Sequence, residues 1–215
     1  MTRLPWKASF IAASVVPILV LMIAGGFAFW SRNMPEIASL TDFAPDSPRQ
    51  ISDEACLSGS VTVIPYSQIP TLLRQAVSTE NRSAIIPLHI SRSLFCNSHD
   101  RLLERELKEM FIAKQLEHRF SREQLFTIYM NRVYFDESTM GVQSAAQRYF
   151  GKDAVALTLP QAALLAGMIR NPHLYSPDKH PGQALQRRNE ILDAMFQQGN
   201  VSAADLQAAK GEPLR

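Results

Sequence analysis

The strongest constraint on the fold is a stretch between residues 100 and 152 in which charged side chains line otherwise apolar segments: DRLLERELKEMFIAKQLEHRFSREQLFTIYMNRVYFDESTMGVQSAAQRYFGK. Apolar residues recur there at steps of three or four, which predicts a helix over residues 102–119 with one face toward a core. The stripe on that face consists of Leu103, Leu107, Met110, Phe111 and Lys114. The stretch has more charged side chains than a buried core requires.

One carboxylate in this helix lies off the stripe. Glu109 shares its helical face with Arg105, which comes one turn earlier, and the remainder of that face is mostly apolar. A guanidinium at this spacing can hold an ionised glutamate where water is scarce. The alternative is a solvated ion pair, which would contribute only a few tenths of a kcal/mol.

Outside this stretch the pattern predicts one mainly α domain. Residues 60–65 form the one convincing strand, and after Arg82 the chain shows no periodicity as far as His99. Helix starts are indicated by capping residues and prolines. They lie near Pro70, at Ser121 with Gln124 three residues on, at Thr158 before Pro160, at Gly182 and at Ser202.

A run of about 23 uncharged residues, 8–30, precedes this domain. It is long enough for a tilted helix across a hydrocarbon core of roughly 30 Å. Arg3 and Lys7 come before the run and mainly acidic residues follow it, so the positive-inside rule places the N-terminus in the cytoplasm. A cleaved signal peptide is the alternative, which the length of the run disfavours.

These features divide the chain into an anchor over residues 1–32, a polar, proline-bearing tether over residues 33–55 and a domain over residues 56–215. The expected location is the cytoplasmic (inner) membrane, crossed once by a single N-terminal transmembrane helix, with the domain in the periplasm. The chain has 215 residues, of which 46% are hydrophobic, so one domain can form a core but a second has no room.

Composition argues against several function classes. The net charge of +2 and the pI of about 8.6 are too mild for nucleic-acid binding, and no basic stripe with interleaved aromatic residues occurs. Neither HExxH nor CxxC is present, so no protein-bound metal site is predicted. Cys56 and Cys96 permit a disulfide outside the cytoplasm, and two separate buried thiols are the alternative.

Four segments together resemble a known family: RELKEMFIAKQLEHRFSREQLFTIYMNRVYF, GVQSAAQRYFGK, LTLPQAALLAG and HPGQALQRRNEILDAMFQQG. Their order and spacing resemble the glycosyltransferases that polymerise lipid II into peptidoglycan, namely the transglycosylase modules of penicillin-binding proteins and their monofunctional relatives. The resemblance runs from about Ile64 to the C-terminus. It implies the lysozyme-like fold of this family for the domain behind the N-terminal anchor. At 215 residues, we expect the chain to have no room for a transpeptidase domain as well.

The resemblance implies that Glu80, in Ser-Thr-Glu-Asn-Arg, is the catalytic base. Its position also suits that role, because it closes an amphipathic helix. The negative end of a helix dipole disfavours an ionised carboxylate and so raises its proton affinity. An exposed glutamate at a helix end is the alternative.

Glu109 matches the second carboxylate of the family, and the resemblance implies that it helps to organise the diphosphate end of the substrate. The residues implied to bind substrate or diphosphate are Arg105, Lys108, Asn131, Arg132 and Lys152. Asn131 and Arg132 match a segment that braces the cleft wall, and helix-end hydrogen bonding is an equal alternative. Lys152 could reach a phosphate, although a surface lysine is the simpler interpretation. Whether a divalent cation, Mg²⁺ or Mn²⁺, assists at the diphosphate stays open.

The chain departs from the family pattern mainly on the side that holds the donor. The tract after Glu80 is shortened to residues 83–95, and the Gly-Gly-Ser-Thr-Ile-Thr-Gln-Gln segment is missing. Four single positions also differ from the residue that is usual in the family. Asn81 stands where the family has Asp, Glu106 where it has Lys, Asp136 where it has Gly and Gln161 where it commonly has Glu. We expect these changes to weaken donor binding more than they disturb the scaffold.

Three functions remain open from the sequence. The first is a peptidoglycan glycosyltransferase that acts on lipid II and lipid-linked glycan at the outer face of the membrane. The second is a catalytically degenerate homologue that binds a lipid-linked precursor or another cell-wall synthase, which the lost donor segment favours. The third is a muramidase-like hydrolase, in which one glutamate acts as an acid. Incubation with lipid II separates them, because polymer, binding without turnover and cleaved glycan are different outcomes.

Overall fold

The structure is a computed structural model, and it describes residues 38–44, 49–52, 60–79, 86–94, 102–136 and 138–214. The chain divides into two units, Met1–Glu36 and Ile37–Arg215, and all described residues belong to the second. The predicted anchor, Glu80 and the two cysteines lie outside the described residues. Within those residues, no helix combines the length and hydropathy that a membrane span needs.

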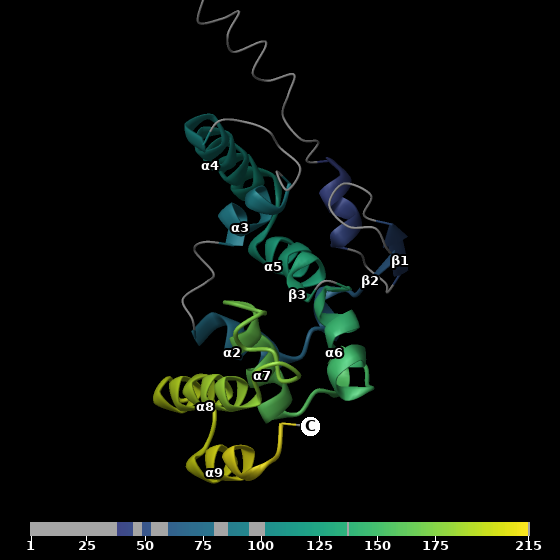
Figure 1. Ribbon diagram of the computed structural model, residues 1–215. Coiled ribbons are helices and arrows are strands. Elements are labelled where there is room, and N and C mark those ends of the chain that lie inside the picture. The colour runs from purple at the N-terminus through teal and green to yellow at the C-terminus, as the bar shows by residue number, and fades with distance from the viewer. Residues whose placement is uncertain are drawn as a thin grey trace, which may run out of the picture. The chain divides into compact units, whose positions relative to one another are not determined.

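The second unit is mainly helical, as predicted (Figure 1). In chain order its elements are η1 (Ala38–Phe43), β1 (Arg49–Ser52), β2 (Ser60–Val63), η2 (Tyr66–Gln68), α2 (Thr71–Thr79), α3 (Ile86–Ser93), α4 (Leu102–Arg119), α5 (Arg122–Arg132), β3 (Tyr134–Asp136), β4 (Thr139–Met140), α6 (Val142–Phe150), η4 (Ala154–Ala156), α7 (Leu159–Met168), α8 (Pro181–Gln197) and α9 (Ala203–Gly211).

Two helices, α5 and α7, form the centre of the core. Residues 125–132 of α5 and most residues of α7 are buried. α7 packs against α2 and α8, while α5 packs against α3, α6 and η1. In Figure 1 the yellow-green helices α7, α8 and α9 lie together, and the teal helices α3, α4 and α5 form a second group. α8 and α9 pack onto one another and onto α7.

The helix starts follow the capping signals of the sequence. The Ser121 hydroxyl accepts a hydrogen bond from the Gln124 backbone N–H at 3.2 Å, and the Gln124 side chain accepts one from the Ser121 N–H at 2.9 Å. At α7 the Gln161 side chain accepts from the Thr158 N–H at 3.1 Å. Gln161 therefore caps a helix, a task for which it is as suitable as the glutamate usual in the family.

Part of the segment expected to be a tether is folded onto the domain. η1 packs against α5 with Leu40 and Phe43 buried, and β1 pairs antiparallel with β2, Arg49 opposite Val63. The side chain of Asn131 links these pieces, because its Nδ2 donates to the carbonyl oxygens of Phe43 and Ile64, each at 2.8 Å. The polar composition of residues 33–55 concealed this packing.

The tract after Arg82 contains a helix, so the prediction of an irregular chain as far as His99 was wrong. α3 buries Ile86, Pro87 and Ile90 against α4 and α5. The helix is only eight residues long, too short for a clear apolar period to stand out in the sequence.

The bounds of α4 match the prediction, but the face that it buries is the opposite one. Its buried residues are Lys108, Glu109, Ile112 and Leu116. The stripe residues Leu103, Leu107 and Met110, predicted to face the core, are exposed. Periodicity predicted the helix correctly. It could not show that the face with Lys108 and Glu109 would be buried, because that depends on ion pairs with other residues.

Candidate active site

A buried carboxylate held by two arginines forms the centre of the candidate site. Glu109 has only 6% of its side chain exposed. Its Oε2 accepts from Arg92 Nε of α3 at 3.0 Å, and its Oε1 accepts from Arg105 Nε of α4 at 2.9 Å. The ion pair with Arg105 confirms the pairing predicted from their spacing. Each carboxylate oxygen of Glu109 therefore has a cationic donor.

Arg92 is the residue that the sequence reasoning missed. It lies in the last turn of α3, within the shortened tract, and 17 positions separate it from Glu109. No local pattern indicates a contact at that separation. The only available signal was a basic residue in the tract where the family pattern is interrupted.

The two arginines give the cluster a net positive charge toward solvent. About 54% of the Arg92 side chain and 37% of the Arg105 side chain are exposed. Both use Nε for Glu109, and within the described part of the chain their Nη atoms make no hydrogen bond. Guanidinium groups in this state bind phosphate oxygens well, because the planar fork presents several N–H donors at once.

Lys108 lies beside this cluster but beneath the surface. Only 1% of its side chain is exposed, and its Nζ forms an ion pair with Glu104 Oε1 at 2.9 Å. The pair is local, one helical turn apart. Lys108 therefore adds positive charge to the neighbourhood of Glu109, but Glu104 offsets much of it.

One cavity borders α3, the helix that carries Arg92, and a second cavity adjoins the first. The larger, of about 460 Å³, is mainly apolar and lies among α3, α5 and the end of α7; the smaller, of about 240 Å³, lies among β3, α6 and residues 172–179. They share Tyr134 and Pro172, so they adjoin one another. His89, Ser93 and Arg132 supply the polar groups of the larger cavity.

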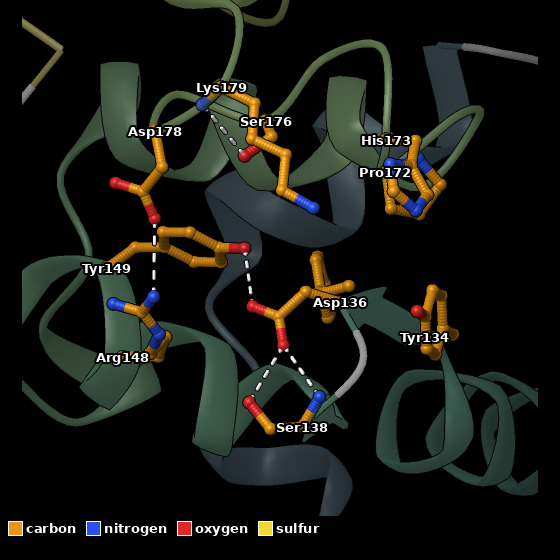
Figure 2. Close-up of a pocket in the computed structure, with 11 residues that line it drawn as sticks. Tyr134, Asp136, Ser138, Arg148, Tyr149, Pro172, His173, Ser176, Asp178 and Lys179 are labelled. Atoms are coloured by element: carbon orange, nitrogen blue, oxygen red, sulfur yellow. Dashed lines mark hydrogen bonds and ion pairs between the residues drawn. The ribbon is translucent and has the colours of Figure 1, made fainter.

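Asp136, which replaces the usual glycine, lies at the centre of the smaller cavity (Figure 2). Its Oδ1 accepts from the Ser138 N–H and hydroxyl, and its Oδ2 accepts the Tyr149 hydroxyl at 2.9 Å. Burial opposes ionisation, but these bonds and one from Thr139 outweigh it and hold the pKa of Asp136 below its ordinary value. Burial and the nearby carboxylate in turn raise the pKa of Tyr149.

Charged groups on the other side of the smaller cavity come from residues 172–179 and α6. Figure 2 shows the Lys179 side chain directed toward the space between Tyr149 and Pro172. Arg148 forms an ion pair with Asp178 at 3.3 Å. The cavity is therefore lined by both signs of charge and by the rings of Tyr134 and Tyr149.

Asn131 is buried within the domain, whereas Arg132 lines the larger cavity. Asn131 is fully buried, and its Oδ1 accepts the Ile64 N–H at 3.0 Å in addition to the two bonds from its Nδ2. This side chain braces the domain and has no surface for a substrate. Arg132 lines the larger cavity, where its guanidinium lies 4.6 Å from the Phe43 ring centroid and its Nε donates to Ser93 Oγ at 3.4 Å.

Lys152 and Glu80 are the remaining predicted site residues. Lys152 lies in the turn after α6 and lines neither of the two cavities. Glu80 follows the last residue of α2 and lies outside the described residues, so its separation from Glu109 stays a prediction. Leu73, Ala76 and Val77, which share its predicted helical face, are buried as expected.

Among the described residues, no group of three or more His, Cys, Asp or Glu side chains is arranged to hold a metal ion. Glu109 already directs both oxygens to arginines. The described residues therefore do not fit a resident divalent cation.

Comparison with known proteins places this arrangement in context. The profile of the family described as Transglycosylase matches residues 86–196, just over half of the chain. Penicillin-binding protein 1A of Streptococcus pneumoniae is 39% identical over 141 residues, which are 65% of this chain and 20% of that protein. Penicillin-binding protein 1A of Aquifex aeolicus is 28% identical over 238 residues, 93% of this chain and 33% of that protein.

A solved structure of penicillin-binding protein 1A from Haemophilus influenzae is also similar, with a TM-score of 0.47 and 21% identity over 79% of this chain and 21% of that one. The chain thus spans between a fifth and a third of the length of these relatives. The family profile begins within α3 and ends within α8, and it includes Arg92, Arg105 and Glu109. On this match the chain belongs to the transglycosylase family.

Proposed function

We propose that the chain is a peptidoglycan glycosyltransferase that polymerises lipid II into glycan strands at the outer face of the cytoplasmic membrane. In this proposal residues 1–32 are a single membrane anchor with the N-terminus inside, and the domain has the lysozyme-like arrangement of its family. The observation that carries the proposal is the buried Glu109 between Arg92 and Arg105, at the family's second carboxylate position.

In the proposed reaction Glu80 is the general base. The acceptor sugar hydroxyl attacks the anomeric carbon of the donor, and its proton passes to the Glu80 carboxylate. The bond between that carbon and the phosphate oxygen breaks, and the lipid diphosphate leaves with the electron pair. The anomeric carbon inverts, because attack and departure take place on opposite faces.

Arg92 and Arg105 would stabilise the departing diphosphate. Negative charge develops on the leaving oxygen in the transition state, and positioned donors that face it lower the barrier. Glu109 would act as a positioning residue, because its two hydrogen bonds hold both guanidinium groups at one place. Arg92 thus supplies a cation from the tract in which the family's donor segment is missing.

The described residues include no cluster that would hold Mg²⁺ or Mn²⁺, and a cation at the diphosphate stays an expectation from the family resemblance. The two guanidinium groups would provide the positive charge at the diphosphate.

A second candidate is a homologue that binds the lipid-linked precursor, or another cell-wall synthase, without catalysis. The observation that favours it is Asp136, an ionised carboxylate beside Tyr134 in a cavity where the family has glycine. A fixed negative charge there would oppose a diphosphate in the same space. Glu106, which stands where the family has lysine, also makes the chain more negative than the family pattern.

The test compares the wild type with Glu80→Gln on lipid II in detergent, with Glu117→Gln as the matched control. Glu117 is an exposed glutamate on α4 that forms only a local ion pair with Lys114. We expect Glu80→Gln to lower the rate of glycan synthesis by about 10²-fold or more with little change in lipid II binding. Glu117→Gln should retain the wild-type rate.

The result decides between the two candidates. Glycan synthesis by the wild type that survives in Glu80→Gln would remove Glu80 from the mechanism. Equal binding of lipid II by both proteins, with no polymer from either where an intact relative makes it, would establish the binding protein.

A further inference from the structure

The smaller cavity holds two opposite charges that do not meet. Asp136 lies on its β3 side, and Lys179 comes from the segment between α7 and α8. Figure 2 shows the Lys179 side chain extending into the cavity from the side opposite Ser138. Among the described residues, none forms a hydrogen bond or an ion pair with the Lys179 ammonium group. The positive charge of Lys179 is therefore available to a ligand.

The negative charge of Asp136 is also uncompensated. Its hydrogen bonds come from Ser138, Thr139 and Tyr149, which are all neutral donors. Such donors stabilise an ionised carboxylate without cancelling its charge. In the part of the chain that the structure describes, no lysine, arginine or histidine forms an ion pair with Asp136. A cationic group that entered the cavity would thus meet an ionised carboxylate that is already held in place.

The other two charges that line the cavity cancel one another. Arg148 Nη2 lies 3.3 Å from Asp178 Oδ2 in an ion pair. Asp136 and Lys179 therefore set the charge pattern that a ligand meets, with one negative and one positive group in a single small space. Such a site favours a ligand that carries both complementary charges, and it discriminates against ligands whose charges are all of one sign.

Size and lining restrict the ligand further. The cavity has a volume of about 240 Å³, which is below the roughly 300–1,000 Å³ of pockets that enclose drug-sized molecules. It therefore suits one end of a ligand. The rings of Tyr134 and Tyr149 line it, and an aromatic ring attracts an ammonium group that lies over its face. The larger cavity adjoins it at Tyr134 and Pro172, so the remainder of a ligand has room to continue there.

From these observations we propose that the smaller cavity binds an amino-acid or peptide end that carries both an ammonium and a carboxylate group. The ammonium lies beside the Asp136 carboxylate and the ring of Tyr149, and the carboxylate lies on the Lys179 ammonium. A diphosphate does not match this pattern, because it carries negative charge alone and Asp136 repels it. A simple amine would leave Lys179 without a partner.

One further step names the source of this ligand, and it rests on the proposed function. Peptidoglycan precursors carry a peptide on their sugars. The larger cavity connects the smaller one with α3, the helix that carries Arg92. In a glycosyltransferase the zwitterionic end would therefore belong to the peptide of the bound precursor. The zwitterion site itself does not depend on this step.

The test measures binding of the dipeptide alanylalanine, a zwitterion at neutral pH, to the full chain in detergent by ligand-observed NMR. Two derivatives are the matched probes. N-acetyl-alanylalanine lacks the ammonium group, and alanylalanine amide lacks the carboxylate. For a ligand of this size we expect a Kd of about 1–10 mM. Each derivative should bind about tenfold more weakly, because it loses one charge-assisted contact.

Lys179→Gln removes the positive side of the site and should retain the fold, because Lys179 is exposed. We expect this variant to bind alanylalanine about tenfold more weakly and to lose the preference for the dipeptide over its amide. Lys114→Gln is the control, since Lys114 is an exposed lysine of α4 that pairs with Glu117 and lies outside the cavity. Asp136→Asn, measured at a temperature at which it is folded, should lose the preference over the N-acetyl derivative.

Three results would overturn the proposed site. They are equal binding of the three probes by the wild type, no saturable binding of alanylalanine, and equal effects of Lys179→Gln and Lys114→Gln.

The step to the substrate peptide is tested with lipid II whose peptide is amidated at its free carboxylates. We expect the wild type to show a KM for this form about fivefold or more above that for unmodified lipid II, with kcat within about twofold. Lys179→Gln should not distinguish the two forms, because it lacks the group that would contact the carboxylate.

The outcomes separate this inference from the proposed function. Selective binding of alanylalanine by a chain that makes no glycan would support the site and refute the enzyme. Glycan synthesis by a chain that binds none of the three probes would overturn the site and leave the enzyme standing. Equal KM values for the two forms of lipid II, together with selective binding of alanylalanine, would assign the cavity to a free amino acid or peptide and overturn only the step to the substrate.

Discussion

Replacement of Glu109 by glutamine tests the most distinctive contact in the structure. The variant keeps the shape of the side chain and one carbonyl oxygen, so one guanidinium can still donate to it. The other oxygen becomes an NH₂ group, which is a donor. It would face the N–H donor of either Arg92 or Arg105, and no hydrogen bond can form between two donors. When the NH₂ group faces Arg92, α3 and α4 lose an attachment that joins residues 17 positions apart.

The expected cost follows from burial. A hydrogen bond to a charged group contributes about 1.5–3 kcal/mol where it is shielded from water. Glu109 is nearly buried, but both arginines are partly in water and can solvate themselves when released. We therefore expect Glu109→Gln to lower the free energy of unfolding by about 1.5–3 kcal/mol, the contribution of one such bond. For a domain of this size that corresponds to a decrease in Tm of about 3–12 °C.

The assay is thermal unfolding of the full chain in detergent, followed by circular dichroism at the helical band. Glu117→Gln serves as the control, because it removes an exposed ion pair with Lys114 on the same helix. That change should lower the free energy of unfolding by no more than about 0.5 kcal/mol. Equal effects of the two substitutions would refute the reasoning, since they would mean that Glu109 is as exposed to solvent as Glu117.

Two further predictions concern the region of β3, β4 and α6. Gly141→Ala should lower the free energy of unfolding by about 1–3 kcal/mol, because Gly141 has φ +79° and ψ 150° and an added Cβ would lie 2.7 Å from the Asn131 carbonyl oxygen. Denaturant unfolding measures this loss. Gly182→Ala is the control and should show no such loss, because nothing lies within 4 Å of its added Cβ. Asp136→Asn should destabilise the protein at neutral pH. The pKa of Asp136 is lowered in the folded state, so its contribution is present above the ordinary value of 3.8 and is lost as the pH falls through the folded value. The difference in stability between wild type and Asp136→Asn should accordingly shrink as the pH falls below 3.8, and a constant difference across the range would contradict this account.

Much of the helical framework was predictable, because the interactions that specify it are local. The bounds of α4, the capping box at Ser121 and the start of α7 depend on residues within three or four positions of one another. Such patterns are legible in a single sequence. The family could be recognised from the sequence for a related reason, because the order and spacing of several such segments identify it.

The arrangement of the candidate site was only partly predictable. The pairing of Arg105 with Glu109 follows from helical geometry, but the contact with Arg92 joins α4 to a helix that the sequence did not indicate. Asn131 was expected at a cleft wall, whereas its amide joins segments 67 and 88 positions away in the chain. Asp136 was recognised as a departure from the family, but its bond to Tyr149, 13 positions later on α6, could not be read from the sequence.

The sequence by itself determined that this protein has a mainly α domain with helices at particular positions, since backbone hydrogen bonds and caps connect near neighbours. Only the tertiary structure decided which face of α4 is buried. An apolar stripe has the same period whether it meets a protein core or a lipid surface, and charged residues can be buried when their partners are brought to them. Here Glu109 goes inward because Arg92 meets it there, and the leucines and methionine of the stripe are left outside.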